Sequence, residues 1–147
     1  MAIQQAVCSS FKKQLLEGDM EFQNGGDVFK LALYTSAANL SAATTAYPGD
    51  STGGQHANTG SYAQGGGVLT AQATSIDTGV AIVDFAELSF TGVTLTVRGA
   101  LIYNTSSATT NAAVAVLDFG GDKTATAGTF TIQFPAFNSS NAILRIS

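Results

Sequence analysis

Beyond residue 26, apolar residues recur at every second position in short runs, and this alternation limits the possible folds more than any other feature. The run VTLTVRG at 93–99 is the clearest, because Val93, Leu95 and Val97 alternate with polar residues. Alternation of this kind places the apolar side chains on one face of a β-strand and the polar side chains on the other. The chain therefore reads as a series of half-buried strands.

Runs that favour strands occur at 28–34, 67–74, 80–85, 93–99, 100–104, 112–119, 129–134 and 142–146. β-branched and aromatic residues fill these runs, and Gly, Asn, Asp and Ser separate them. The connections are too short for the crossover helices of a parallel sheet. We therefore expect a mainly β chain folded as an antiparallel, jelly-roll-like β-sandwich. The predicted core is Phe29, Leu31, Leu33, Val80, Ile82, Val93, Leu95, Val97, Leu101, Val114, Val116, Phe130, Ile132 and Phe134.

The stretch GGDK at 120–123 separates an apolar strand from a threonine-rich run. Two adjacent glycines at such a place favour a backbone with positive φ. We expect either a tight hairpin or a β-bulge there.

The N-terminal segment departs from the alternation, because its apolar residues repeat in steps of four. Val7, Phe11 and Leu15 form a stripe that predicts one short helix over about residues 5–17. Gly18 is the expected stop, since glycine suits the left-handed conformation after a helix. The stripe must pack on the chain's own sandwich or on a neighbouring subunit.

Ser9 and Ser10, either of which could cap a shorter helix, each stand three residues before a lysine, Lys12 or Lys13. S-x-x-K is the spacing of a serine nucleophile and its lysine on a helix. Such an enzyme also needs an oxyanion hole and a second proton-relay group. The partner motifs S-D-N and K-T-G are absent, so we interpret the spacing as coincidence.

The chain has 147 residues, which predicts a single domain over 1–147. Charged residues make up only 11% of it, against roughly 25% in an ordinary soluble domain. A free monomer usually carries a more charged surface. The neutral surface favours a chain whose surface is covered in an assembly; the alternative is a secreted β-domain with a Ser, Thr and Asn surface.

Several function classes do not fit. The six basic residues are scattered, so nucleic-acid binding is not expected. The single cysteine, Cys8, cannot form an internal disulfide. MAIQQAV lacks the features of a secretory signal, and no apolar run is long enough for a membrane span. We expect a chain made and folded in a reducing cytoplasm.

Catalytic chemistry finds little support. His56 is the only histidine, and no G-x-S-x-G motif supplies a serine for it. Metal sites usually need two or more His or Cys ligands. Asp84 and Glu87 would point to opposite faces of a strand. A hydrolase with carboxylates that meet in space is the enzymatic alternative, but the prediction is no catalytic, cofactor-binding or metal-binding residue.

The segment 36–66 is long, polar and rich in glycine. A loop of this length is usually functional, disordered or part of an interface. We expect interfaces at residues 47–66 of this loop and at the N-terminal segment, residues 1–10. The predicted interface residues are Ile3, Val7, Tyr47, His56 and Tyr62.

Several blocks together resemble a family of small structural proteins of tailed bacteriophages. The blocks are CSSFKKQLLEG, DVFKLALYTSAANLSAATTAY, RGALIYN, AVAVLDFGGDKTATAGTFTIQFP and NAILRI. The resemblance covers about residues 7–146, and the family is expected to vary most at 50–66. It implies a virion component with no catalytic residues to carry over.

Proteins of this kind look like capsid decoration, or cement, proteins. These are small β-domains, often trimers, that clamp neighbouring capsid subunits on the outside of the head. The resemblance thus implies the major capsid protein as partner, a homo-oligomer with a trimer favoured, and a place on the capsid surface after synthesis in the host cytoplasm. The alternative is a tail or fibre protein that contacts the host.

Overall fold

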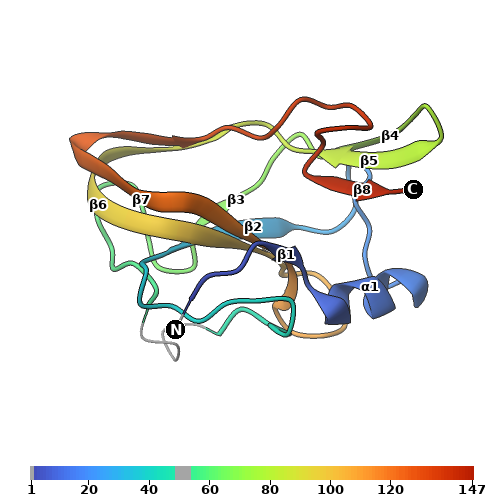
Figure 1. Cartoon of the computed structure of the whole chain (residues 1–147), viewed down its shortest axis with the longest axis horizontal. Coiled ribbons are helices and arrows are strands. Elements are labelled where there is room, and N and C mark those ends of the chain that lie inside the picture. The colour runs from blue at the N-terminus through green and yellow to red at the C-terminus, as the bar shows by residue number, and fades with distance from the viewer. Residues whose placement is uncertain (1, 49–53) are drawn as a thin grey trace.

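The computed structural model describes residues 2–48 and 54–147 as antiparallel strands with one short helix (Figure 1). A five-stranded sheet has the order β1-β7-β6-β2-β3, and a three-stranded sheet has the order β4-β5-β8. The mainly β, antiparallel, two-sheet prediction is therefore confirmed. The elements are β1 (Ala6–Val7), α1 (Ser9–Leu16), β2 (Phe29–Tyr34), β3 (Gly67–Val68), β4 (Ala73–Asp77), β5 (Val80–Asp84), β6 (Leu88–Asn104), β7 (Ala112–Ile132) and β8 (Leu144–Ile146).

Two long strands dominate the fold, and each contains two of the runs that the sequence separates. Strand β6 includes 93–99 and 100–104, while β7 includes 112–119 and 129–134. They pair as a hairpin from Asn104 opposite Ala112 to Leu88 opposite Ile132. The sheets divide five and three, with the orders β1-β7-β6-β2-β3 and β4-β5-β8, and these orders do not reproduce the paired Greek keys of a jelly roll.

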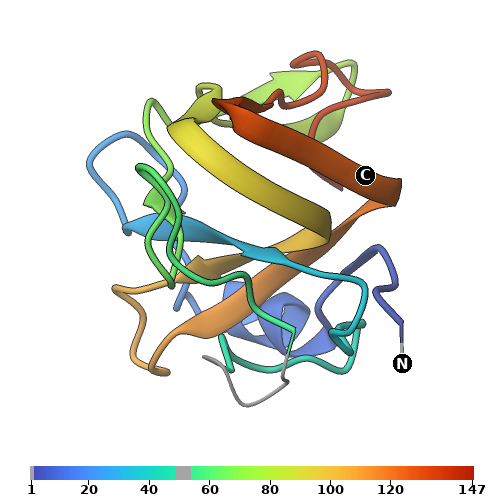
Figure 2. The ribbon, with the colours of Figure 1, turned by 90° about the vertical axis from the view of Figure 1, so that its left-hand side faces the viewer.

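The stretch GGDK lies inside β7 as a bulge, so the bulge expectation is confirmed and the hairpin alternative is wrong. Gly99 pairs with Asp118 but Val97 pairs with Lys123, so residues 119–122 of β7 stand opposite a single residue of β6. Gly120 has a φ of +80° there. Bulges bend strands and increase their twist. The hairpin accordingly bends back over the core (Figure 2).

Most of the predicted core is buried, but Val80, Phe130 and Phe134 are only partly buried. The core also contains residues outside the predicted strands. Phe22 stacks on Phe29, with ring centroids 4.4 Å apart. Tyr62, from the long loop, is 1% exposed.

The helix begins at Ser9, and the prediction that it starts near residue 5 is wrong. Ala6 and Val7 instead form β1, which pairs with Val116 and Ala115 of β7. By pairing with the otherwise open edge of β7, these residues provide hydrogen-bond partners for their backbone N–H and C=O groups. Cys8 is the N-cap and has no side-chain capping bond, so neither serine takes that role.

The predicted end of the helix is confirmed. Gly18 follows the C-cap Glu17, has a φ of +76°, and donates its N–H to the carbonyl of Leu15 at 3.3 Å. This is the left-handed stop that glycine provides at low conformational cost.

Candidate functional site

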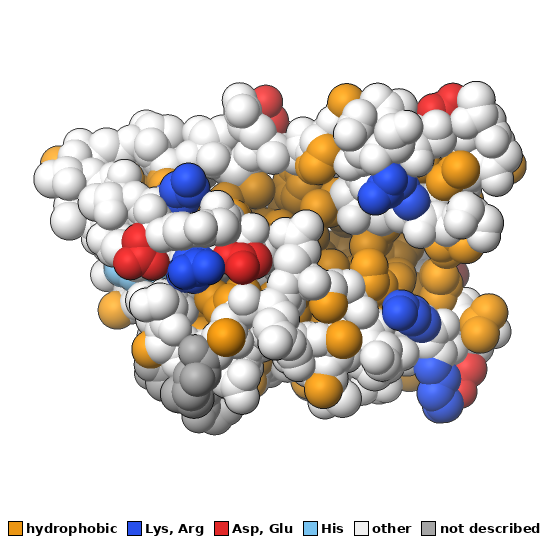
Figure 3. Space-filling view, in the orientation of Figure 1, with side chains coloured by type: hydrophobic (Ala, Val, Ile, Leu, Met, Phe, Trp, Pro, Cys, Tyr) orange, Lys and Arg blue, Asp and Glu red, His pale blue; other side chains and the backbone are white. Residues whose placement is uncertain are grey.

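An apolar groove of about 840 Å³ lies between α1 and the small sheet β4-β5-β8. Figure 3 shows it as a hollow lined by hydrophobic side chains, open toward the viewer. The helix wall continues the N-terminal stripe expected from the sequence. Its apolar lining is Val7, Phe11, Leu15, Leu16, Met20, Phe22, Ala81, Ile82, Val83, Leu144 and Ile146.

The helix wall consists of one buried and one protruding part. Phe11 is 4% exposed and packs against Phe22, with ring centroids 5.8 Å apart at a steep angle. Leu16, in the last turn of α1, is 90% exposed. The helix is therefore anchored by Phe11, while Leu16 projects at the margin of the groove.

The opposite wall comes from the small sheet. Ile76 pairs with Ala81, and Ala81 pairs with Ile146, so these three residues form one row across the sheet. Ala81 and Ile146 line the groove, while Ile76 extends the apolar row beyond it. Ile76 is 77% exposed and Ile146 is 56% exposed.

Among the described residues, the three most exposed large apolar side chains are Leu16, Ile76 and Ile146. All three belong to the groove or to the row that continues it. Single exposed apolar residues are ordinary on protein surfaces, but a contiguous apolar patch marks a contact or ligand surface. The groove and its margin are therefore the candidate functional site.

The groove margin is basic. Lys12 and Arg145 line it, and no Asp or Glu side chain does. Arg145 donates to the carbonyl of Ser140. Within residues 2–48 and 54–147, neither Lys12 nor Arg145 lies within 4 Å of a carboxylate. An occupant that brings carboxylates to the margin would therefore gain favourable contacts.

The structure shows where the residues considered for catalysis and metal binding lie. No hydrogen bond joins Ser9 or Ser10 to a lysine, and Lys13 instead pairs with Glu17 at 2.7 Å. The ring of His56 lies 2.8 Å from the carbonyl oxygen of Ala57. Among the described residues, no group of three or more His, Cys, Asp or Glu side chains could hold a metal ion. No described helix is long and apolar enough to span a membrane.

The predicted interface residues are separated by the structure. Ile3 is 7% exposed and Tyr62 is 1% exposed, so both belong to the chain's own core. This corrects the prediction that they lie on an exposed interface. Ile3 is buried because its segment bridges Leu40. Tyr47 is half-buried and stacks on Tyr103, with ring centroids 4.5 Å apart.

Tyr62 shows why part of the long loop is structural. Its hydroxyl accepts the N–H of Leu33 at 2.9 Å. Burial raises the pKa of Tyr62 to about 12. His56 packs edge-on against it and is half-buried, and residues 49–53 lie outside the described part. Of the predicted residues, only Val7 lines the groove.

Two strands of the sheet wall, β5 and β8, lie within the predicted runs 80–85 and 142–146, but sequence reasoning missed β4 and the groove itself. Asp77 pairs with Val80, so Thr78 and Gly79 form a two-residue hairpin turn. Both have positive φ, which is typical of a type I′ turn. The dipeptide Thr-Gly between ATSID and VAIVD was the available signal for β4, and hence for Ile76.

No protein-family model matches this chain. No curated protein and no solved structure matches it either.

Proposed function

We propose that this chain is a non-enzymatic virion structural protein of a tailed bacteriophage, a decoration protein that binds the outside of the head. The observation that carries the proposal is the gathering of the most exposed apolar side chains at one groove. Such a surface suits a protein whose function is to bind other protein surfaces. The 11% charged composition agrees, because interface cores are depleted of charged residues.

The resemblance of the blocks FKLALYTS, GALIYN and VLDFGGDKT to phage structural proteins supports the placement in a virion. The proposed mechanism is adhesion. A decoration protein lowers the free energy of the closed shell by burying surface on neighbouring major capsid subunits. A standard interface buries about 1,600 Å² in total. Many symmetry-related copies then add their contributions through multivalency.

Quantitative mass spectrometry of the phage that encodes this chain tests the proposal. Virions are separated into heads and tails, and the copy number is compared with that of the major capsid protein. We expect many copies in the head fraction and none in the tail fraction. Few copies, confined to tails, would overturn the proposal in favour of a tail or fibre protein.

Heads that lack the protein provide the second readout. We expect them to release DNA at a lower temperature than complete heads, and to regain the original temperature when purified protein is added back. Equal release temperatures would contradict a stabilising role.

A further inference from the structure

We propose that a second copy of this chain covers the apolar groove, so that the protein self-associates through α1 and the small sheet. The inference rests on the proposed function in one respect, which is that the groove is a contact surface for protein. It adds the surface through which copies of the chain meet, since the resemblance implies a homo-oligomer without saying which residues join it.

The shape of the surface is the first argument. The hollow and the side chains that protrude beside it, Leu16 and Ile146, lie on the same face of one chain. Closed oligomers form when a surface meets a copy of itself or of a neighbouring patch. Leu16 of one copy then enters the hollow of another. A two-fold pair and the trimer expected from the sequence both bury this face between copies.

A small apolar molecule explains the surface less well. A volume of about 840 Å³ is within the range of small-molecule pockets. However, Ile76 does not line the groove and Leu16 is 90% exposed at its margin. A molecule inside the hollow would leave much of both side chains in water. A protein surface laid across the face covers the hollow and the protruding residues together.

The charges are the second argument. Lys12 and Arg145 make no ion pair with a described residue, whereas the chain carries ten acidic residues against six basic ones. Glu17 directly follows Leu16 in the sequence and bonds only to Lys13, in an exposed pair four residues apart. Such surface pairs contribute little, so Glu17 can exchange partners at low cost. A neighbouring copy that inserts Leu16 also brings Glu17 toward this basic margin.

The sheet edges are the third argument. β4 and β8 are the outer strands of the small sheet, and their outer edges make no backbone hydrogen bond with a described residue. Open edges beside exposed apolar residues favour uncontrolled pairing, and natural proteins usually cover or protect them. A second copy seated on the groove shields the edge that carries Ile146.

Sedimentation velocity of the purified full chain, from micromolar to submillimolar concentration, tests the proposal. We expect the wild-type protein to form an oligomer. Leu16→Lys should weaken association roughly 30-fold or more, because it brings a positive charge into the apolar hollow of the neighbouring copy, beside Lys12 and Arg145. Val68→Lys is the matched control, since Val68 is 49% exposed on β3 and does not line the groove. It should associate like the wild type.

Two results overturn the proposal. One is a wild-type protein that is monomeric throughout this range, which would leave the groove to another partner. The other is an oligomer that Leu16→Lys does not weaken. Circular dichroism spectra that match the wild type show that the variants are folded, and Leu16 is exposed enough for the substitution to leave the core intact.

Cross-linking gives an independent readout. Ile146→Cys places a thiol at the groove, and a bismaleimide should then join two chains covalently. The native cysteine does not interfere, because Cys8 is fully buried. Val68→Cys should give mostly monomer, and equal cross-linking of the two variants would overturn the proposal.

The outcomes separate this inference from the proposed function. Self-association through the groove by a protein that is absent from heads would overturn the proposed function and leave the inference standing. A monomeric protein found in many copies on heads would overturn the inference and leave the proposed function standing.

Discussion

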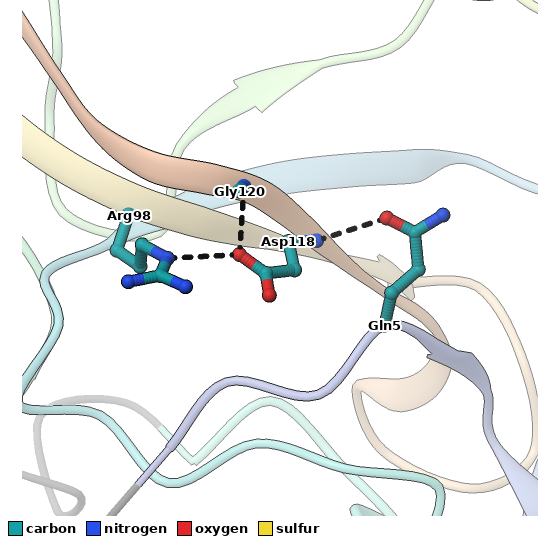
Figure 4. Close-up of polar contacts among 4 residues, drawn as sticks. All are labelled: Gln5, Arg98, Asp118 and Gly120. Carbon is teal, nitrogen blue, oxygen red and sulfur yellow. Dashed lines mark hydrogen bonds and ion pairs between the residues drawn. The ribbon is translucent and has the colours of Figure 1, made fainter.

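Arg98 Nε lies 2.9 Å from Asp118 Oδ1, and this ion pair holds the point where β6 and β7 slip out of register. The same oxygen accepts the backbone N–H of Gly120 at 2.9 Å. The N–H of Asp118 donates to Gln5 Oε1 at 3.2 Å (Figure 4). One carboxylate thus ties the neighbouring strand to the bulge, and its backbone holds the N-terminal segment.

Asp118→Asn is expected to lower stability more at neutral pH than at low pH. The hydrogen bond from Arg98, and then that from Gly120, lowers the pKa of the Asp118 carboxyl. A carboxyl whose pKa is lower in the folded state stabilises the fold above its unfolded pKa, about 3.9. That contribution is lost as the pH falls through the folded-state value. Urea unfolding should show a smaller difference between wild type and variant near pH 3 than at pH 7.

Asp122→Asn is the control for this pair, because the Asp122 carboxylate acts on Arg98 only through its charge and forms no hydrogen bond or ion pair with a described residue. It should show a smaller pH-dependent difference. If both variants lose the same stability at pH 7, the specific contact with Arg98 and Gly120 does not matter.

Gly120→Ala should destabilise the protein by about 1 kcal/mol, because a residue with a side chain is strained at a φ of +80°. An added Cβ there meets no atom within 4 Å, so the cost comes from the backbone alone. Gly121→Ala is the matched control, since its surroundings are equally open and its φ is not in the left-handed region. Chemical denaturation that finds the two variants equally stable would contradict the bulge geometry.

This bulge also shows what the sequence can and cannot predict. Alternation places Val97 and Leu101 correctly in the core, because burial on one face is a local pattern. A glycine pair marks a positive φ, but the same pair serves a hairpin or a bulge. Only the pairing of residues 112–132 with β6 decides between them, and that pairing is a long-range property.

The sequence predicts the helix side of the groove, whereas on the sheet side it predicts strands but not how they pair. Phe11 and Leu15 follow from helical spacing, and the helix wall was expected to need a partner surface. Val7 fits the same spacing but lies in a strand, because its backbone pairs with Ala115. Ile76 and Ile146 meet through two different strand pairings around β5, and no local pattern reports that arrangement.

Tyr62→Phe should destabilise the protein by about 1–3 kcal/mol, because it leaves the buried N–H of Leu33 without its acceptor. The aromatic ring is kept, so its edge-on contact with Phe90 survives and no cavity forms. Thermal and chemical unfolding measure the loss. A variant that keeps wild-type stability but binds phage heads poorly would instead support the interface role that the sequence predicted for Tyr62.

Cys8 should resist alkylation in the folded protein. Burial raises the pKa of its thiol to about 11, so at pH 8 only about one thiol in a thousand is ionised. Iodoacetamide should label Cys8 slowly in buffer and rapidly in urea. Because the folded-state pKa is raised, this thiol contributes stability that is present below the unfolded value of about 8.5 and is lost as the pH rises toward 11. The stability advantage of wild type over Cys8→Ala, measured by urea unfolding, should therefore narrow above pH 9. Rapid labelling of the native chain at pH 8 would show that Cys8 is not held in the core.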